Sequence, residues 1–213
     1  MITRVHRVDP IQPRPSVLEQ AADTLRTGGV AAFPTETFYG LAAAISNADA
    51  VARVFSVKGR EATKPILVLI DSPVMVESLA AVVSHSARSL MARHWPGALT
   101  LVIPARPSVP TALTAGTGTI GIRWPAHAVA VGLVKALGEP VTAPSANPSQ
   151  ATAPRTPEEV LRYFDGLVDL VLDAGPTSGG APSTVLDVSV DPPRLLRKGA
   201  VAALEGPCWA PVR

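Results

Sequence analysis

The sequence predicts an α/β fold in which helices cover most of a sheet. Segments with helical periodicity alternate with short apolar segments along the whole chain, which is the pattern of such folds. Hydrophobic residues make up 47% of the 213 residues and charged residues 17%, so the chain can bury a core and intrinsic disorder is excluded. The 22 prolines interrupt any long helix, which excludes a coiled coil. Because no repeat or linker marks a boundary, we expect one domain over residues 1–213.

The expected helices begin at capping residues and carry one apolar face. The first would span 16–27, with Ser16 and Glu19 forming a capping box. The second would begin at Asn47 or Asp49 and run to Lys58. The other helix starts are expected at Ser72, Ser84, Ala128 and Thr156.

Strands are expected where short apolar segments are bounded by proline, glycine or polar residues. Residues 66–70 form a continuous apolar run, which is typical of a central strand. The other expected strands cover 30–33, 99–103, 119–123, 141–143, 170–173, 184–188 and 194–197. The last eight residues, 206–213, are expected to form a tail.

Several classes of protein are excluded by what the sequence lacks. No run of 18 apolar residues exists, so no membrane span is expected, and residues 1–9 lack the apolar core of a signal peptide. The single cysteine, Cys208, cannot form an internal disulfide, which fits a reducing cytoplasm. A net charge of +2 is weak evidence for a nucleic-acid partner.

Familiar site motifs are absent or out of context. Residues 116–121 match G-x-G-x-x-G, but they lead into an expected strand and not into a helix, so they do not predict a dinucleotide site. No P-loop and no G-x-S-x-G nucleophile motif occurs. The four histidines lack metal-ligand spacing, so no protein-held metal is expected.

Polar residues follow expected strands at five places, and each place also has an ordinary interpretation as a turn or helix cap. Open α/β sheets bind ligands at the ends of their strands, so the five places would line one crevice. Lys58, Arg60 and Lys64 lie close enough in sequence to clamp a polyphosphate. The five places are 34–41, 58–65, 117–123, 143–149, and 179–185 together with Arg197.

The motifs at these places, taken in order, resemble one family. The sequence contains PTETFYGLAA, KGREATKPILVLI, WPGALTLVIP, GTIGIRWPAH, APSANPSQ, PRTPEEV, DAGPTSGGAPSTVLDVS and PRLLRKGAV. Over residues 16–204 this resembles the YrdC-like threonylcarbamoyl-AMP synthases. The resemblance implies a twisted open mixed sheet flanked by helices, with a deep positively charged cavity. It also implies no second, C-terminal domain in a chain of this length.

The resemblance implies the following reaction and partners. L-threonine, bicarbonate and ATP would give threonylcarbamoyl-AMP and pyrophosphate, and the product would serve tRNA threonylcarbamoyladenosine modification by a downstream transferase complex. ATP would be a substrate, with Mg²⁺ bound through its triphosphate. Weak tRNA binding would accompany this function, and no membrane would be involved.

The resemblance also assigns the site residues. Lys58 and Arg60 would be catalytic, through charge and positioning. Contacts to ATP are implied for Arg60, Lys64, Thr119, Ser145, Asn147, Ala153 (through its backbone) and Arg197. Contacts to L-threonine are implied for Thr37, Arg123, Ala143 and Ser183. Two positions depart from the family pattern: Lys64 replaces an asparagine found in many relatives, and Leu69 replaces a histidine found in some.

Two other interpretations of the sequence remain open. One is a double-stranded RNA or tRNA-binding module without catalysis, although the chain has few aromatic residues for stacking on bases. The other is a paralogue that activates a different carbamate or carboxylate, which Leu69 leaves open.

Overall fold

Two sheets form the frame of the protein in residues 2–201 and 210–211, which the computed structural model describes. The smaller sheet has the order β1 (Arg4–Arg7), β8 (Leu170–Asp173), β2 (Ala31–Phe33) and β3 (Gly40–Ala42). The larger sheet has the order β11 (Ala210–Pro211), β10 (Arg194–Arg197), β9 (Thr184–Asp187), β5 (Leu99–Pro104), β6 (Thr119–Arg123), β4 (Val68–Leu69) and β7 (Val141–Thr142). Both sheets mix parallel and antiparallel pairs, and single bridges from Gly40 to Ser145 and from Ala44 to Val141 connect them.

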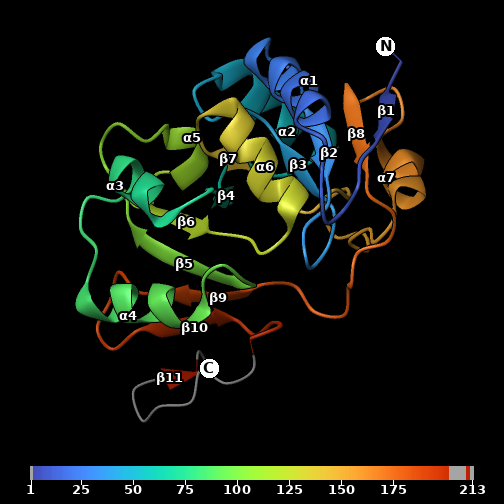
Figure 1. Ribbon diagram of the computed structural model, residues 1–213. Coiled ribbons are helices and arrows are strands. Elements are labelled where there is room, and N and C mark those ends of the chain that lie inside the picture. Colours follow the sequence, from blue (N-terminus) through green and yellow to red (C-terminus); the bar gives the residue numbers. More distant parts are fainter. Residues whose placement is uncertain (1, 202–209, 212–213) are drawn as a thin grey trace.

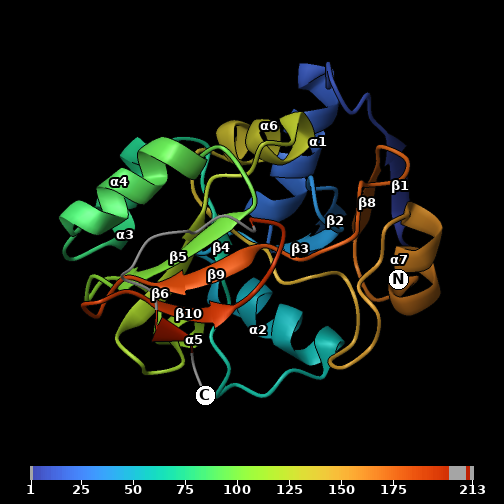
Figure 2. The same ribbon diagram turned by 90° about the horizontal axis from the view of Figure 1, so that it is seen from below.

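Helices cover both sides of this frame (Figures 1 and 2). Helices α1 (Pro15–Arg26) and α6 (Ala128–Leu137) lie side by side on one side, and α2 (Ala48–Lys58) lies on the opposite side. Gly132 permits the close approach of α1 and α6, because a Cβ there would lie 2.5 Å from Leu18 Cδ1. The remaining helices are α3 (Val76–Leu79), α4 (His85–His94), α5 (Thr111–Thr114), α7 (Pro157–Phe164) and a 3₁₀ turn at Pro73–Met75.

The predicted α/β class is confirmed, and most expected elements are present within one or two residues. Strands β6, β8 and β10 have the expected bounds, and α6 ends at Leu137 and is capped by Gly138, whose φ of 83° is left-handed. Among the described residues, no helix combines the length and the apolar character needed to span a bilayer.

Four local predictions are wrong or incomplete. The capping box of the first helix does not form, because the helix begins one residue earlier, at Pro15, after Arg14. Strands β1 and β3 and the short helix α5 were not expected, since none carries a long apolar pattern. Of the run 66–70, only Val68 and Leu69 pair as a strand. Of the expected tail, Ala210–Pro211 pairs with β10, and the rest lies outside the described residues.

Candidate active site

A cavity of about 900 Å³ lies over one face of the larger sheet. On β6 the lining residues are Thr119, Gly121 and Arg123, and this period of two places them on the same face of the strand. Alternate residues of β5 and β9 line it in the same way, and β4 contributes Leu69. The loop after β2, the end of α2 and the loop after β7 complete the wall. The five polar segments predicted from the sequence therefore meet at one cavity.

The cavity gathers all the predicted site residues except Lys64. The ammonium of Lys64 forms an ion pair with Glu61 at 3.1 Å on the protein surface, and its side chain is 53% exposed. Leu69, the second departure from the family pattern, lines the cavity and is fully buried. The predicted residues in the lining are Thr37, Lys58, Arg60, Thr119, Arg123, Ala143, Ser145, Asn147, Ala153, Ser183 and Arg197.

Lys58 connects the end of α2 to the loop after β7 through hydrogen bonds. Gly59 ends the helix in the left-handed region at a φ of 55°, which leaves Lys58 as its last residue. The ammonium of Lys58 donates to the carbonyl oxygens of Ser145 and Asn147, both at 2.5 Å, and the Ser149 amide donates back to the Lys58 carbonyl at 2.8 Å. Burial, helped by the positive charge of Arg60, lowers the pKa of Lys58 to about 8.

Arg60 lies beside Lys58 at the cavity wall. Its Nη2 donates to the Pro65 carbonyl at 2.7 Å and its Nε to the Lys64 carbonyl at 3.3 Å. Neither contact uses Nη1, so the guanidinium keeps donors for a ligand. Burial lowers the pKa of Arg60 below its usual value, but an arginine remains charged at neutral pH.

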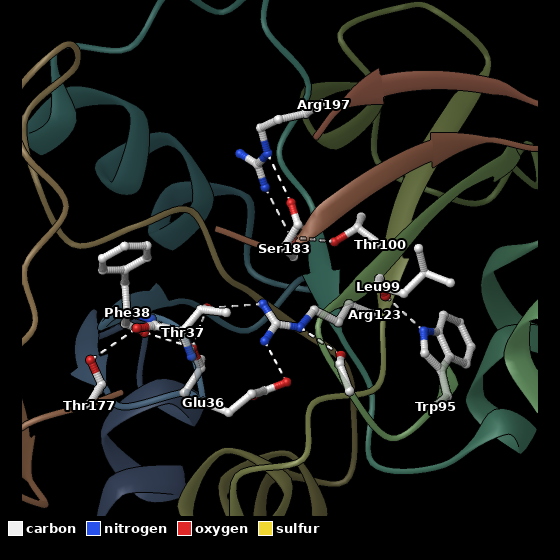
Figure 3. A network of polar contacts seen from close by, with 12 residues as sticks. Glu36, Thr37, Phe38, Trp95, Leu99, Thr100, Arg123, Thr177, Ser183 and Arg197 are labelled. Carbon is white, nitrogen blue, oxygen red and sulfur yellow. Dashed lines mark hydrogen bonds and ion pairs between the residues drawn. The ribbon is translucent and has the colours of Figure 1, made fainter. Parts of the chain in front are cut away.

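Arg123 and Arg197 bring two more guanidinium groups to the cavity (Figure 3). Arg197 donates from Nε to the Ser183 carbonyl at 3.1 Å and from Nη2 to the Ser183 hydroxyl at 2.9 Å. Arg123 donates from Nε to the Gly97 carbonyl at 3.1 Å and from Nη1 to the Thr37 hydroxyl at 3.4 Å. Burial, and then the positive charge of Arg123, lower the pKa of Arg197.

The side-chain amide of Asn147 stabilises the loop after β7, in which this residue lies. Asn147 Nδ2 donates to the carbonyls of Pro148 and Ala151, at 2.8 and 2.7 Å. Because both amide protons are used in this way, Asn147 gives the loop its shape and presents Ser145 and Ala153 on the same wall of the cavity.

The structure adds two residues that the sequence analysis did not single out. Glu36 forms an ion pair with Arg123, at 2.6 Å between Oε1 and Nη2. Thr177 donates from its hydroxyl to the Thr37 carbonyl at 3.0 Å and so fixes the loop after β2. Glu36 stands between two buried threonines in the PTET motif, and this position was the only signal that the sequence offered.

Carboxylates are scarce in the described lining of the cavity. Asp187 is the acidic residue there, and both of its oxygens are already engaged. Oδ1 accepts from the Ser189 amide and hydroxyl, and Oδ2 pairs with Arg194 at 3.2 Å. Among the described residues, no cluster of three or more His, Cys, Asp or Glu side chains is arranged to hold a metal ion. The described lining thus contains Lys58 and four arginines but only one carboxylate.

The lowered pKa of Lys58 predicts how anion binding depends on pH. Lys58 is charged below about pH 8 and loses its charge as the pH rises through that value. An anionic nucleotide should therefore bind more weakly at pH 9 than at pH 7.5, with an inflection near pH 8, in titrations with ATP. Lys58→Met should remove the inflection, whereas Lys64→Met should keep it. A flat wild-type profile would contradict this role of the Lys58 charge.

Comparisons with known proteins identify the family of the chain. Residues 23–199 match the Sua5/YciO/YrdC family, which is described as "Telomere recombination". The chain is 41% identical to a threonylcarbamoyl-AMP synthase of Bacillus subtilis over 194 residues, which are 91% of this chain and 56% of that protein. It is 36% identical to a putative threonylcarbamoyl-AMP synthase of Mycobacterium tuberculosis, over 91% of this chain and 88% of that protein.

A solved structure is similar over most of the chain. Pyrococcus abyssi Sua5, crystallised with L-threonine, matches with a TM-score of 0.90 and 39% identity, over 92% of this chain and 58% of that one. The chain thus spans a little over half the length of the Bacillus and Pyrococcus proteins. Because the family match covers most of the chain, the chain belongs to the Sua5/YciO/YrdC family.

Proposed function

We propose that this chain is an L-threonylcarbamoyladenylate synthase, which makes threonylcarbamoyl-AMP and pyrophosphate from L-threonine, bicarbonate and ATP. The observation that carries the proposal is one cavity in which basic side chains from distant segments meet short hydroxyl and amide side chains. The names of the Bacillus and Mycobacterium relatives, and the L-threonine bound to the Pyrococcus protein, support the same activity.

The nucleotide would lie along the wall formed by the end of α2 and the loop after β7. Arg60 and Arg197 would donate hydrogen bonds from their guanidinium groups to the phosphates. Lys58, whose ammonium contacts carbonyls of the loop after β7, would add positive charge. Thr119, Ser145, Asn147 and Ala153 would give the remaining contacts, the last through its backbone. Lys64 would reach the nucleotide only if it left Glu61, so we propose a minor part for it.

The amino acid would lie at the other end of the cavity, against Arg123. A guanidinium matches a carboxylate in shape and charge, and the Thr37 hydroxyl stands beside it. Ser183 and the backbone at Ala143 line the same region. This assignment places the carboxylate of threonine on Arg123 and its amine toward the nucleotide.

The chemical step joins two anions, so charge compensation is its main requirement. The threonine nitrogen first adds to bicarbonate with loss of water, which gives a carbamate. A carbamate oxygen then attacks the α-phosphorus of ATP, and the bond from that phosphorus to the bridging oxygen breaks to release pyrophosphate. Negative charge that builds at phosphorus would be stabilised by Arg60, Arg197 and Lys58, which are already in place before the reaction.

Mg²⁺ fits this site only as a companion of the triphosphate, since Asp187 is already paired with Arg194 and Ser189. When bound, it would neutralise phosphate charge with few protein ligands. The product would pass to a transferase that modifies tRNA.

Omission of single substrates tests the function directly. Pyrophosphate release is expected only when ATP, L-threonine and bicarbonate are all present, and the adenylate should be detected by mass spectrometry. Release that is equally fast without threonine would reject the proposal. Release that requires another amino acid would identify a paralogue with a different substrate.

A further inference from the structure

Glu36 lies against Arg123 on the side away from the cavity. Thr35, Thr37 and Phe38, its neighbours in the loop after β2, line the cavity, but Glu36 does not. Figure 3 shows the guanidinium of Arg123 reaching from β6 toward Thr37 and Glu36. Because the Arg123 side chain is 5% exposed and that of Glu36 is 22% exposed, water screens this ion pair poorly.

Arg123 is the cation that faces Glu36 among the described residues. Oε1 is 2.6 Å from Arg123 Nη2 in an ion pair, and both carboxylate oxygens are buried and accept no hydrogen bond from the part of the chain that the structure describes. His127 also feels Glu36, whose charge raises the pKa of His127, but burial outweighs this and lowers it. His127 Nδ1 accepts from the Val129 amide at 3.2 Å, so this nitrogen acts as a helix cap and not as a partner of Glu36.

Glu36 has two effects on any carboxylate that binds Arg123. It fixes the guanidinium, together with the Gly97 carbonyl on Nε and the Thr37 hydroxyl on Nη1. It also places a negative charge behind the guanidinium, which repels an incoming anion. The first effect improves geometry and the second reduces affinity.

We propose that Glu36 is a positioning residue that orients Arg123 and, through its charge, weakens the binding of the amino-acid carboxylate. The proposal rests on the proposed function in taking an amino acid as the ligand of Arg123. In this proposal Glu36 offsets the charge of Arg123, while Lys58 and Arg60 have no carboxylate partner among the described residues. The nucleotide is thereby directed to Arg60 and the amino acid to Arg123.

Glu36→Gln separates the two effects, because the amide keeps the size and polarity of the side chain beside Arg123 while the charge is removed. Isothermal titration of the full chain with L-threonine should give a Kd three- to tenfold lower than that of wild type. L-threoninol, which lacks the carboxylate, should not gain affinity. Glu36→Ala removes the polar side chain beside Arg123 as well and should bind threonine more weakly than Glu36→Gln. Glu19→Gln, in an exposed ion pair with Arg26, is the matched control and should change nothing.

The following outcomes would overturn the proposal or the function on which it rests. An L-threonine Kd for Glu36→Gln that equals or exceeds that of wild type overturns the proposal, as does an equal gain for L-threoninol. If Glu36→Gln fails to fold, Glu36→Asp replaces it: the charge is kept but its reach is shortened, so weaker threonine binding is expected and unchanged binding overturns the proposal. Wild-type protein that shows no binding of L-threonine rejects the proposed function itself, which is a separate result.

Discussion

Arg60→Ala is expected to lower turnover by about 100-fold while the protein stays folded. Removing one preorganised donor from a site that stabilises developing charge typically reduces kcat by about 10²–10³. Arg60 lines the cavity wall beside Lys58, and its contacts to the carbonyls of Pro65 and Lys64 hold its guanidinium in place before a ligand arrives. Because these two carbonyls lie near the surface, water can replace the lost donors, and circular dichroism should remain unchanged.

Two further variants make this prediction specific. Arg106→Ala is the matched control, since Arg106 also donates to a backbone carbonyl, that of Ala80, but does not line the cavity. It should keep wild-type turnover. Arg60→Lys keeps the charge but loses the planar fork, so it should recover only part of the activity. An Arg60→Ala protein with full turnover would remove Arg60 from the site.

Elements with strong local signals could be predicted from the sequence. Strand β6 is bounded by Gly118 and Pro125, and α6 combines an apolar face with a glycine at its end, so their limits match the expectation. Strand β1 could not be found in this way, because RVHR is mostly exposed at the edge of the sheet and has no apolar run. Its place depends on pairing with β8, more than 160 residues away.

The sequence also allowed us to predict that the candidate site residues would lie together. Polar residues that follow buried strands lie at one edge of a sheet, and the cavity gathers all the residues that the motifs name except Lys64. What each side chain touches was not predictable. The Lys58 ammonium meets backbone carbonyls 87 and 89 residues away, and the Arg123 guanidinium meets Glu36. Such contacts depend on tertiary packing, which single motifs do not encode. The pairing of Lys64 with Glu61 is different, because it is a local contact three residues apart that keeps the ammonium outside the cavity.

Arg123→Ala is expected to destabilise the protein as well as to impair threonine use. It would leave the Glu36 carboxylate in a largely buried place without its cation. Breaking a buried ion pair from one side costs about 3–5 kcal/mol, and both carboxylate oxygens of Glu36 are buried. Urea unfolding at pH 7 should therefore show a loss of about 3 kcal/mol. The KM for threonine should rise more than the KM for ATP.

The double variant Glu36→Gln/Arg123→Ala distinguishes these two effects. It removes the unpaired charge, so at least half of the lost stability should return, because replacing both partners of a buried pair costs less than removing one. The high KM for threonine should remain, since no guanidinium is left to meet the carboxylate. If the double variant were as unstable as Arg123→Ala, the loss of stability would come from the lost packing of the Arg123 methylene groups. The unpaired Glu36 carboxylate would then not be its cause. If both variants used threonine normally, the amino acid would have to bind elsewhere in the cavity, and Arg197 beside Ser183 would be the next guanidinium to test.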